Sequence, residues 1–414
     1  RALCFGIIGG VAGAAIALGP LIGGWVTTEL SWRYVFAAET VIVIAILILR
    51  RQLHPAPRLD QPPRLDVVGV LLSATGLGLG VFGVLKSSEW GWVEPRGALE
   101  IGGTEITPLG FSAVPFFILA GLALLAGFVS WEERRERRGQ DTLLDRSLLR
   151  IETLRAGLTT LLMQQLILLG TFFVLPVYLQ VVLGLDAFET GKKLFPMSVA
   201  MLAAALAGPR LASLLAPKRV AQAGLVSLVI AAVVLLGTID VELDEGTFAL
   251  ALALFGVGAG LLLSQLGNVI MSAVKPSQTN EAGGLQGTAQ NLGASLGTAV
   301  IGSVLISALT NGFVAKVEQN PAVPAKTRDQ IVAAAESGIP VAPVDQVEQV
   351  ALDNGLPQAQ ATAIADDYGD AELDGLKRAL GAVAVLAFLA LWFTRNLPGH
   401  AIRAGPPEPV AAAT

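Results

Sequence analysis

Charged side chains are scarce in this sequence: Asp, Glu, Lys and Arg make up 15% of its 414 residues, whereas 53% are hydrophobic. Soluble domains usually carry about 25% charged residues. The few charges gather in short clusters, and the runs between them are long and apolar. Because about 20 apolar residues in a helix cross the hydrocarbon core of a bilayer, this pattern excludes a soluble domain. We expect an all-α, polytopic bundle of transmembrane helices.

Cysteine and histidine are nearly absent. The single cysteine, Cys4, excludes an intrachain disulfide and a multi-cysteine metal site. The two histidines, His54 and His400, lie in polar connections, and no serine–histidine nucleophile arrangement is present. We therefore expect no enzyme activity, no metal and no cofactor.

Ten apolar segments qualify as spans, namely 2–26, 33–49, 67–86, 111–131, 156–183, 194–216, 220–239, 247–272, 282–311 and 379–394. Lys and Arg concentrate in alternate connections, on the side that holds Arg1 and the cluster at 134–138. The positive-inside rule makes this side cytoplasmic. We expect a multi-pass protein of the cell membrane with a cytoplasmic C-terminus.

The connection 312–374 differs from the others. It is rich in Asp and Glu, contains several prolines, and includes alanine-rich pieces such as QIVAAAESG. Structureless connections of this length are uncommon in compact folds. We expect an extracytoplasmic loop that forms short amphipathic helices or is partly disordered.

Two motifs typical of soluble enzymes occur in the wrong context. GVGAG at 256–260 resembles a dinucleotide-binding loop, but it lies inside a span without the strand that such a loop follows, so we expect small residues for close helix packing. DDYGD at 366–370 has the spacing of a diphosphate–Mg²⁺ site, but no second aspartate cluster faces it. We expect a solvated acidic turn there.

Glu39 is the acidic residue that this interpretation places well inside a span, in its extracytoplasmic half. Ionisable groups in a membrane are costly and by default mark a substrate or ion pathway. Glu39 is therefore a candidate proton site. The alternatives are a structural pair with Arg33 or a hydrogen bond to a neighbouring helix.

Several amide side chains also lie within the predicted spans. Amides in a bilayer usually form hydrogen bonds between helices. A polar lining for a central cavity is the alternative, and both interpretations stay open. The residues concerned are Gln164, Gln165, Gln265, Asn268, Gln290 and Asn291.

Small residues recur four positions apart in two of the spans, 2–26 and 282–311. Residues at this spacing share a helix face, and glycine lets two backbones approach closely. Pro20 should bend the first of these helices, because it has no N–H for the carbonyl of Ile16. We expect helix packing at Gly19, Gly23, Gly283, Gly287, Gly293 and Gly297.

The segment ALGPLIGGW, followed by SWRYVF, resembles the antiporter motif of drug:proton antiporters of the major facilitator superfamily. The pattern Gly-Pro-x-x-Gly-Gly stands late in a span, and the next span begins near its extracytoplasmic end. The resemblance implies a gate helix that seals the outward side against proton leak. The residues that carry it are Gly19, Pro20, Gly23, Gly24, Trp32 and Arg33.

Other segments resemble the fourteen-span branch of that family. WEERRERRGQDTLLDRSLLR resembles the basic loop after two extra central helices, and FFVLPVYLQVVLGLDAFETG resembles a Pro-x-Tyr-x-Gln segment. EAGGLQGTAQNLGASLGTAVIG resembles the glycine-rich thirteenth helix. GPRLASLLAPKRV resembles a degenerate cytoplasmic loop motif that keeps Arg210, Lys218 and Arg219 but lacks its aspartate.

The resemblance implies that the ten spans are family helices five to fourteen, with the first four absent from this chain. It implies a transporter whose two helix bundles alternate around a midplane site, exporting small amphipathic or cationic compounds in exchange for protons. We expect contact with the lipid bilayer, no nucleic-acid partner, and a monomer. Two departures are Ala15, where relatives usually have glycine, and Glu39, where many have asparagine.

The resemblance also divides the chain into six parts. They are the end of an N-terminal bundle (1–49), two central spans with their basic loops (50–155), C-terminal bundle spans (156–311), an acidic extracytoplasmic loop (312–374), the last span (375–396) and a cytoplasmic tail (397–414).

Two alternatives to an exporter stay open at this point. One is a truncated or split transporter half without activity of its own, which the start at Arg1 favours. The other is uptake or facilitated transport of a specific metabolite on the same fold. A membrane-embedded enzyme is disfavoured, because no paired metal or nucleophile cluster is present.

Overall fold

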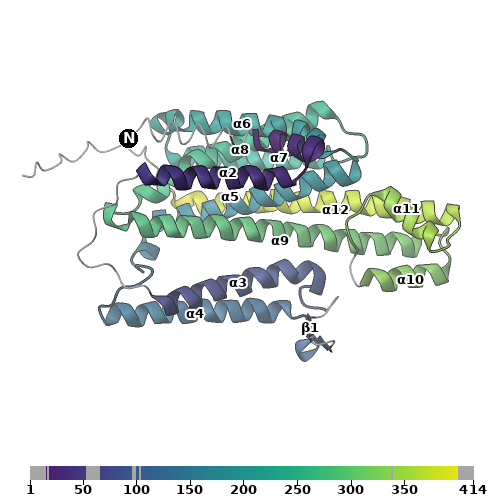
Figure 1. Cartoon of the computed structure of the whole chain (residues 1–414), viewed down its shortest axis with the longest axis horizontal. Coiled ribbons are helices and arrows are strands. Elements are labelled where there is room, and N and C mark those ends of the chain that lie inside the picture. The colour runs from purple at the N-terminus through teal and green to yellow at the C-terminus, as the bar shows by residue number, and fades with distance from the viewer. Residues whose placement is uncertain are drawn as a thin grey trace, which may run out of the picture.

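The computed structural model is a helical bundle with one small hairpin (Figure 1). It describes residues 15, 18–52, 66–95, 99–101, 104–336 and 339–399. The hairpin pairs β1 (Leu99–Ile101) with β2 (Thr104–Ile106) in antiparallel register. Short helical turns join the longer helices, with π-helical turns η1 (Val26–Leu30) and η5 (Tyr178–Val182) and 3₁₀ turns η2 (Arg50–Gln52), η3 (Pro108–Gly110), η4 (Leu148–Arg150), η6 (Pro276–Gln278) and η7 (Thr394–Asn396).

Six long helices form the main bundle. They are α5 (Glu152–Val177), α6 (Ala187–Leu214), α7 (Pro217–Leu236), α8 (Glu245–Ser272), α9 (Thr279–Gln319) and α12 (Gln358–Phe393). α8 packs against α6 and α7, while α5 packs against α9 and α12. Their shared core is almost wholly aliphatic and aromatic, with Phe248, Phe255 and Ile301 fully enclosed. Burial of this apolar surface in place of lipid contact holds the helices together through close packing.

Glycines let α8 approach its two neighbours. A side chain at Gly256 would overlap the backbone carbonyl of Met197 on α6, and one at Gly258 would lie 2.6 Å from the carbonyl oxygen of Gly224 on α7. Gly260 meets the carbonyl of Met201 in the same way. The expectation of close helix packing at 256–260 is confirmed.

Two further helices, α3 (Val67–Trp90) and α4 (Val114–Arg137), form a hairpin beside the bundle (Figure 1). Within the described residues, α3 packs against α9, and the indole Nε1 of Trp92 donates a hydrogen bond to Ser303 Oγ (3.0 Å). α9 is therefore the helix that connects the hairpin to the bundle.

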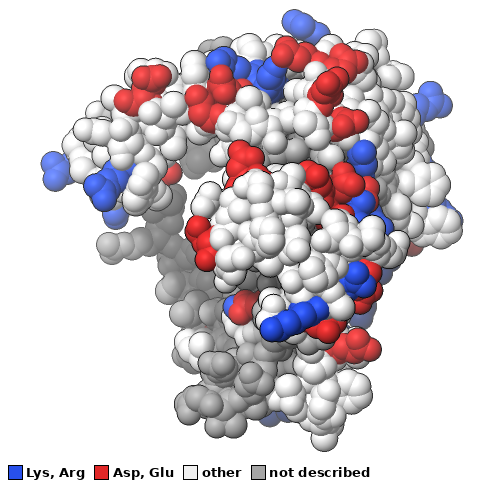
Figure 2. Space-filling view, turned by 90° about the vertical axis from the view of Figure 1, so that its right-hand side faces the viewer, with Lys and Arg blue, Asp and Glu red and all other residues white. Residues whose placement is uncertain are grey.

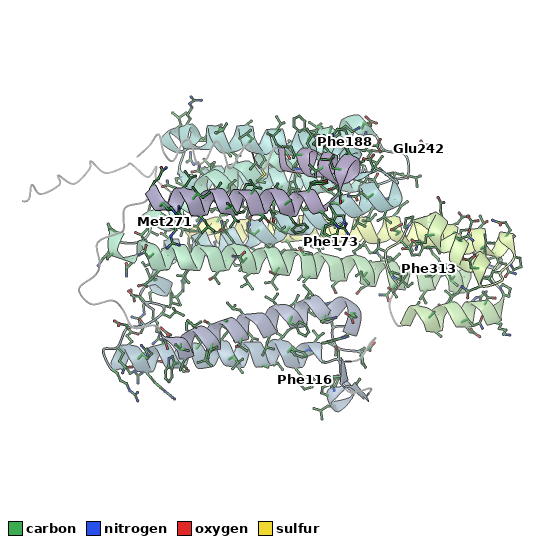
Figure 3. The ribbon with its side chains drawn as sticks, viewed as in Figure 1. Phe116, Phe173, Phe188, Glu242, Met271 and Phe313 are labelled. Carbon is green, nitrogen blue, oxygen red and sulfur yellow. The ribbon has the colours of Figure 1, made fainter. Side chains whose placement is uncertain are left out.

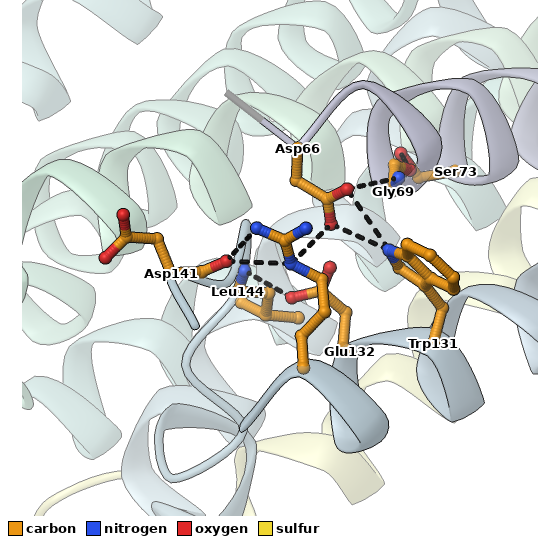
Figure 4. A network of polar contacts seen from close by, with 8 residues as sticks. Asp66, Gly69, Ser73, Trp131, Glu132, Asp141 and Leu144 are labelled. Atoms are coloured by element: carbon orange, nitrogen blue, oxygen red, sulfur yellow. Dashed lines mark hydrogen bonds and ion pairs between the residues drawn. The ribbon is translucent and has the colours of Figure 1, made fainter. Parts of the chain in front are cut away.

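A buried carboxyl closes the other end of this hairpin (Figure 4). Asp66 caps α3 by accepting a hydrogen bond from Gly69 N–H (3.0 Å), and both its oxygens accept from the Trp131 indole of α4 (3.1 Å). Arg135 lies 3.6 Å from Asp66 and donates to the carbonyl of Asp141. One carboxylate thus joins both helices and the loop after α4.

The first described helix, residues 18–30, ends in η1 and is followed by α2 (Arg33–Leu49). No residue of α2 is buried. Ile16 and Ala17 lie outside the described residues, so the bend expected at Pro20 falls partly outside them too.

Seven helices within the described residues are long and apolar enough to cross a membrane: Val67–Ser87, Val114–Arg137, Glu152–Val182, Pro217–Leu236, Glu245–Ser272, Pro276–Gln319 and Gln358–Asn396. Three of the ten predicted spans are not among them. Segment 2–26 lies mostly outside the described residues, α2 has only 17 residues, and α6 contains side chains that are not described. These three remain predictions.

The acidic connection 312–374 is helical along most of its length. α9 continues to Gln319, α10 (Ala325–Glu336) and α11 (Val344–Asp353) follow, and α12 begins at Gln358. They enclose a second apolar cluster built around Phe313 and Tyr368. Acidic side chains spread over this end of the molecule, which we call the cap (Figure 2). The expected short helices are present. The prediction of a turn at 366–370 is wrong, because these residues lie within α12.

Candidate functional site

Helix 18–30 touches the main bundle at the start of α6. A side chain at Gly24 would overlap the carbonyl of Ala187, and one at Gly191 would lie 2.5 Å from the carbonyl oxygen of Pro20. The N–H of Phe188 also donates to Thr28 Oγ1 (3.3 Å), and Figure 3 labels Phe188 beside this helix. Two glycines, one on each helix, therefore let the backbones meet directly.

The other two glycines of the motif face away from α6. A side chain at Gly19 or Gly23 would meet no atom within 4 Å. They line an apolar groove of about 730 Å³ between helix 18–30 and α2, together with Tyr34, Ala38 and Glu39. The motif thus divides its residues between a tight contact and an open groove.

Glu39 lies in the groove with an exposed side chain. Among the described residues no ion pair joins it to Arg33, whose guanidinium lies 5.6 Å from the Trp32 ring centroid. Six residues correspond to 600° of helical rotation, which places Arg33 and Glu39 on different faces of α2. Of the three interpretations of Glu39, the one that pairs it structurally with Arg33 is therefore wrong.

Two of the candidate amides are buried and bridge helices. Gln164 Nε2 of α5 donates to the carbonyl of Ala259 on α8 (3.4 Å), and Gln265 Nε2 of α8 donates to the carbonyl of Gly208 on α6 (3.1 Å). Each retains a buried Oε1 atom without a hydrogen-bond partner in the described structure. These amides therefore act as links between helices, and each keeps one acceptor free.

The remaining amides are more accessible. Gln165 and Gln290 are half-buried, whereas Asn268 and Asn291 are exposed. Asn291 Nδ2 donates to the carbonyl of Gly287 on its own helix (2.9 Å). The six amides thus differ in exposure, and their function as cavity lining stays a prediction.

The glycines of α9 also fall into two groups. Side chains at Gly293 and Gly297 would overlap the carbonyls of Leu162 and Leu166 on α5. At Gly287 a side chain would meet nothing within 4 Å, and at Gly283 only the Met271 methyl at 3.8 Å. Among the described residues no backbone lies against these last two positions, so close packing there stays a prediction.

The residues of the predicted cytoplasmic loop motif lie where α6 ends and α7 begins. Lys218 Nζ donates to the carbonyl of Arg395 (2.6 Å), and Gln222 Nε2 donates to Thr394 Oγ1 (3.2 Å). Arg210 and Arg219 are exposed. Lys218 thus binds the end of α12, where the last carbonyls of a helix favour a cation.

Sequence reasoning missed one acidic residue inside the bundle, Glu372 of α12. It is fully buried, with 0% of its surface exposed. The sequence nevertheless contains a pattern that indicates this burial. The apolar face of the last span continues toward the N-terminus at helical spacing through Leu376, Tyr368, Ala365 and Ala361.

Comparison with known proteins agrees with this architecture. The protein-family model of the Major Facilitator Superfamily matches residues 1–298 of the sequence. The chain is 28% identical over 401 residues to the tetracenomycin C resistance and export protein of Streptomyces glaucescens, covering 95% of the chain and 68% of that protein. It is 30% identical over 344 residues to a probable actinorhodin transporter of Streptomyces coelicolor, covering 81% of the chain and 56% of that protein.

A multidrug efflux pump of Mycolicibacterium smegmatis is 27% identical over 381 residues, which cover 91% of the chain and 68% of the pump. The chain thus spans between about half and two thirds of the length of these curated relatives. The chain belongs to the Major Facilitator Superfamily, whose members named here are transporters and export proteins rather than enzymes.

Proposed function

We propose that this chain forms part of a secondary active transporter that exports small amphipathic or cationic compounds in exchange for protons. The relatives named above, an antibiotic resistance and export protein, a probable transporter and a multidrug efflux pump, support export of small compounds. The observation that carries the proposal is the backbone contact between helix 18–30 and α6, because a glycine-lined contact can close tightly and open again without moving large side chains.

We place this contact between two bundles that alternate around a central site. Helix 18–30 and α2 belong to one bundle, and the six long helices form the other. The distribution of Lys and Arg favours an extracytoplasmic position for the contact and a cytoplasmic C-terminus. In this arrangement the contact seals the outward side while the transporter faces inward.

The α3–α4 hairpin supports the fourteen-span branch of the family. It lies beside the six-helix bundle and packs on α9, as expected of two extra central helices. On this assignment the ten predicted spans correspond to helices five to fourteen, and the transporter works as a monomer.

Glu39 is the proposed proton site of the first bundle. Its side chain lines the apolar groove, within a stretch of α2 whose neighbouring side chains are almost all apolar, and an ionisable group in such a predicted span by default marks a substrate or ion pathway.

The test is transport of ethidium, a cationic dye, by the chain in proteoliposomes. An imposed proton gradient should drive ethidium against its own gradient, and a protonophore should abolish this. Glu39→Gln should lose the proton-driven component while inserting normally, whereas Thr40→Ser, its neighbour on α2, should not.

Three results would contradict the proposal. Ethidium movement that follows only its own gradient indicates facilitated transport. Movement in the same direction as the protons indicates uptake. Unchanged proton-driven export by Glu39→Gln removes Glu39 from the mechanism.

A further inference from the structure

Glu372 is an acidic residue enclosed by α12 and its neighbours, close to the cap. It lies on the face of α12 that also carries Tyr368, Ala371 and Leu376, all of them buried. Neither of its carboxyl oxygens has a hydrogen-bond partner in the described structure. The phenol of Tyr368, one turn earlier, is engaged elsewhere, since it donates to the carbonyl of Pro340 (3.0 Å) and accepts from Ala342 N–H (2.9 Å).

The cationic groups on the helices around α12 either bind other groups or lie far from Glu372. Lys316 of α9 pairs with Asp370 (3.1 Å) on another face of α12. Arg155 of α5 lies with Trp392 and Arg395, at the opposite end of α12. Lys218 of α7 binds the carbonyl of Arg395 at that same end. None of them forms an ion pair with Glu372 in the described structure.

The other titratable groups of these elements do not supply a counter-charge. α11 carries only acidic ones, and Tyr178 of η5 donates to the carbonyl of Asp240 (2.7 Å). The two basic residues of α12 itself, Lys377 and Arg378, follow Glu372 by five and six positions, off its face. The acidic groups concerned are Asp345, Glu348 and Asp353 of α11, Glu152 of α5, Glu281 and Glu318 of α9, and Asp366, Asp367, Asp370 and Asp374 of α12.

An ionised carboxylate without a partner costs several kcal/mol when it is removed from water, and such a group neutralises instead. The enclosed position of Glu372 is therefore compatible with the acid form and not with the carboxylate. An enclosed carboxyl that no cation or hydrogen-bond donor compensates is a candidate proton-binding group. An alanine or leucine would fill this apolar site without that cost.

We propose that Glu372 is a proton-binding site of the transporter. Its carboxyl holds one proton while the elements packed on α12 enclose it, and it releases that proton when water reaches the site during the transport cycle. This inference rests on the proposed exchange of a compound for protons, and it places a proton site in the second bundle, in addition to Glu39 in the first.

The first experiment tests whether the enclosed carboxyl is protonated, and it does not require transport. Dicyclohexylcarbodiimide modifies protonated carboxyls in apolar surroundings, and mass spectrometry locates the adduct. We expect an adduct at Glu372 in the full chain in liposomes at about pH 7, where an ordinary Glu is ionised, and none at exposed Asp374. A folded protein whose Glu372 stays unmodified would overturn the proposal.

The second experiment tests whether this proton is exchanged during export of ethidium. Glu372→Gln keeps a neutral side chain of similar shape, so it should insert and bind ethidium but lose proton release on binding and lose proton-driven export. Asp374→Asn, two positions along the helix and exposed, should keep both. Proton-coupled export by Glu372→Gln at the rate of the unmodified chain would overturn the proposal.

The two experiments separate the possible failures. If the unmodified chain moves ethidium without protons, the proposed function fails, while the carbodiimide adduct still decides whether Glu372 holds a proton. If Glu372→Gln does not insert, labelling of the unmodified chain in the presence and absence of ethidium replaces it. We expect ethidium to change the adduct yield, and an unchanged yield would contradict proton exchange at Glu372.

Discussion

At the scale of single residues, Asp66 shows how one charge organises a membrane-facing hairpin. Burial raises the pKa of its carboxyl, but the hydrogen bonds with Gly69 N–H, the Glu132 carboxyl and the Trp131 indole, together with the positive charge of Arg135, outweigh this and lower the pKa below its ordinary value. A lowered pKa in the folded state means that the ionised form stabilises the fold.

This stabilisation is present above the ordinary pKa of Asp, about 3.9, and is lost as the pH falls through that region. Asp66→Asn should therefore lower the thermal stability of the protein at neutral pH, by about 2 kcal/mol for hydrogen bonds to a charged group. The difference between the two proteins should shrink below about pH 4. Thermal unfolding in detergent across this pH range measures it.

Asp329→Asn is the matched control, since Asp329 is exposed on α10. It should leave the unfolding temperature unchanged at every pH. A difference between the unmodified chain and Asp66→Asn that is constant across pH would show that the charge of Asp66 does not stabilise the hairpin.

Glu39 and Glu372 show what the sequence reveals about single residues and what it does not. Glu39 is surrounded by an apolar run, so composition alone predicts an intramembrane position for it. Glu372 is flanked by Asp370, Asp374, Lys377 and Arg378, which make the segment polar on average. Its burial is indicated only by the helical spacing of the apolar residues, which form one continuous face of α12 while the charged residues lie on the other faces.

At the scale of elements, the two groups of glycines on α9 allow a paired test. Gly297 faces the backbone of Leu166 on α5, whereas Gly287 faces open space. Gly297→Ala should force α9 and α5 apart and cost about 1–3 kcal/mol of stability. Gly287→Ala should be neutral or stabilising by up to about 1 kcal/mol, because alanine favours the helix.

Thermal unfolding of the two variants, followed by size-exclusion chromatography, gives the comparison. Equal losses would contradict the packing of α9 against α5 described here, as would a loss at Gly287 alone. The result does not depend on transport.

The sequence predicts the helices of the bundle well, because each contains a long apolar run bounded by charge or proline. It predicts their ends poorly. α9 continues past 311 and α12 begins at Gln358, since polar residues extend these helices while one face stays packed in the cap. The sequence also cannot tell which glycines meet a backbone: Gly287 and Gly297 have similar surroundings in sequence and opposite ones in space.

At the scale of the whole molecule, the proposed transport cycle depends on one contact between two groups of helices. Helix 18–30 meets α6 through Gly24 and Gly191, and Thr28 binds the N–H of Phe188. If this contact is the gate on the extracytoplasmic side, then every transport cycle must open it. A transporter locked at this point should neither export its compound nor admit protons.

The direct measurement joins the two helices with a short thiol crosslinker between Thr28→Cys and Phe188→Cys, on a Cys4→Ser background that removes the only native thiol. Crosslinking in proteoliposomes should stop both ethidium export and proton entry, and the uncrosslinked double variant should retain both. Ethidium export that continues at an unchanged rate in the crosslinked protein would contradict the gate.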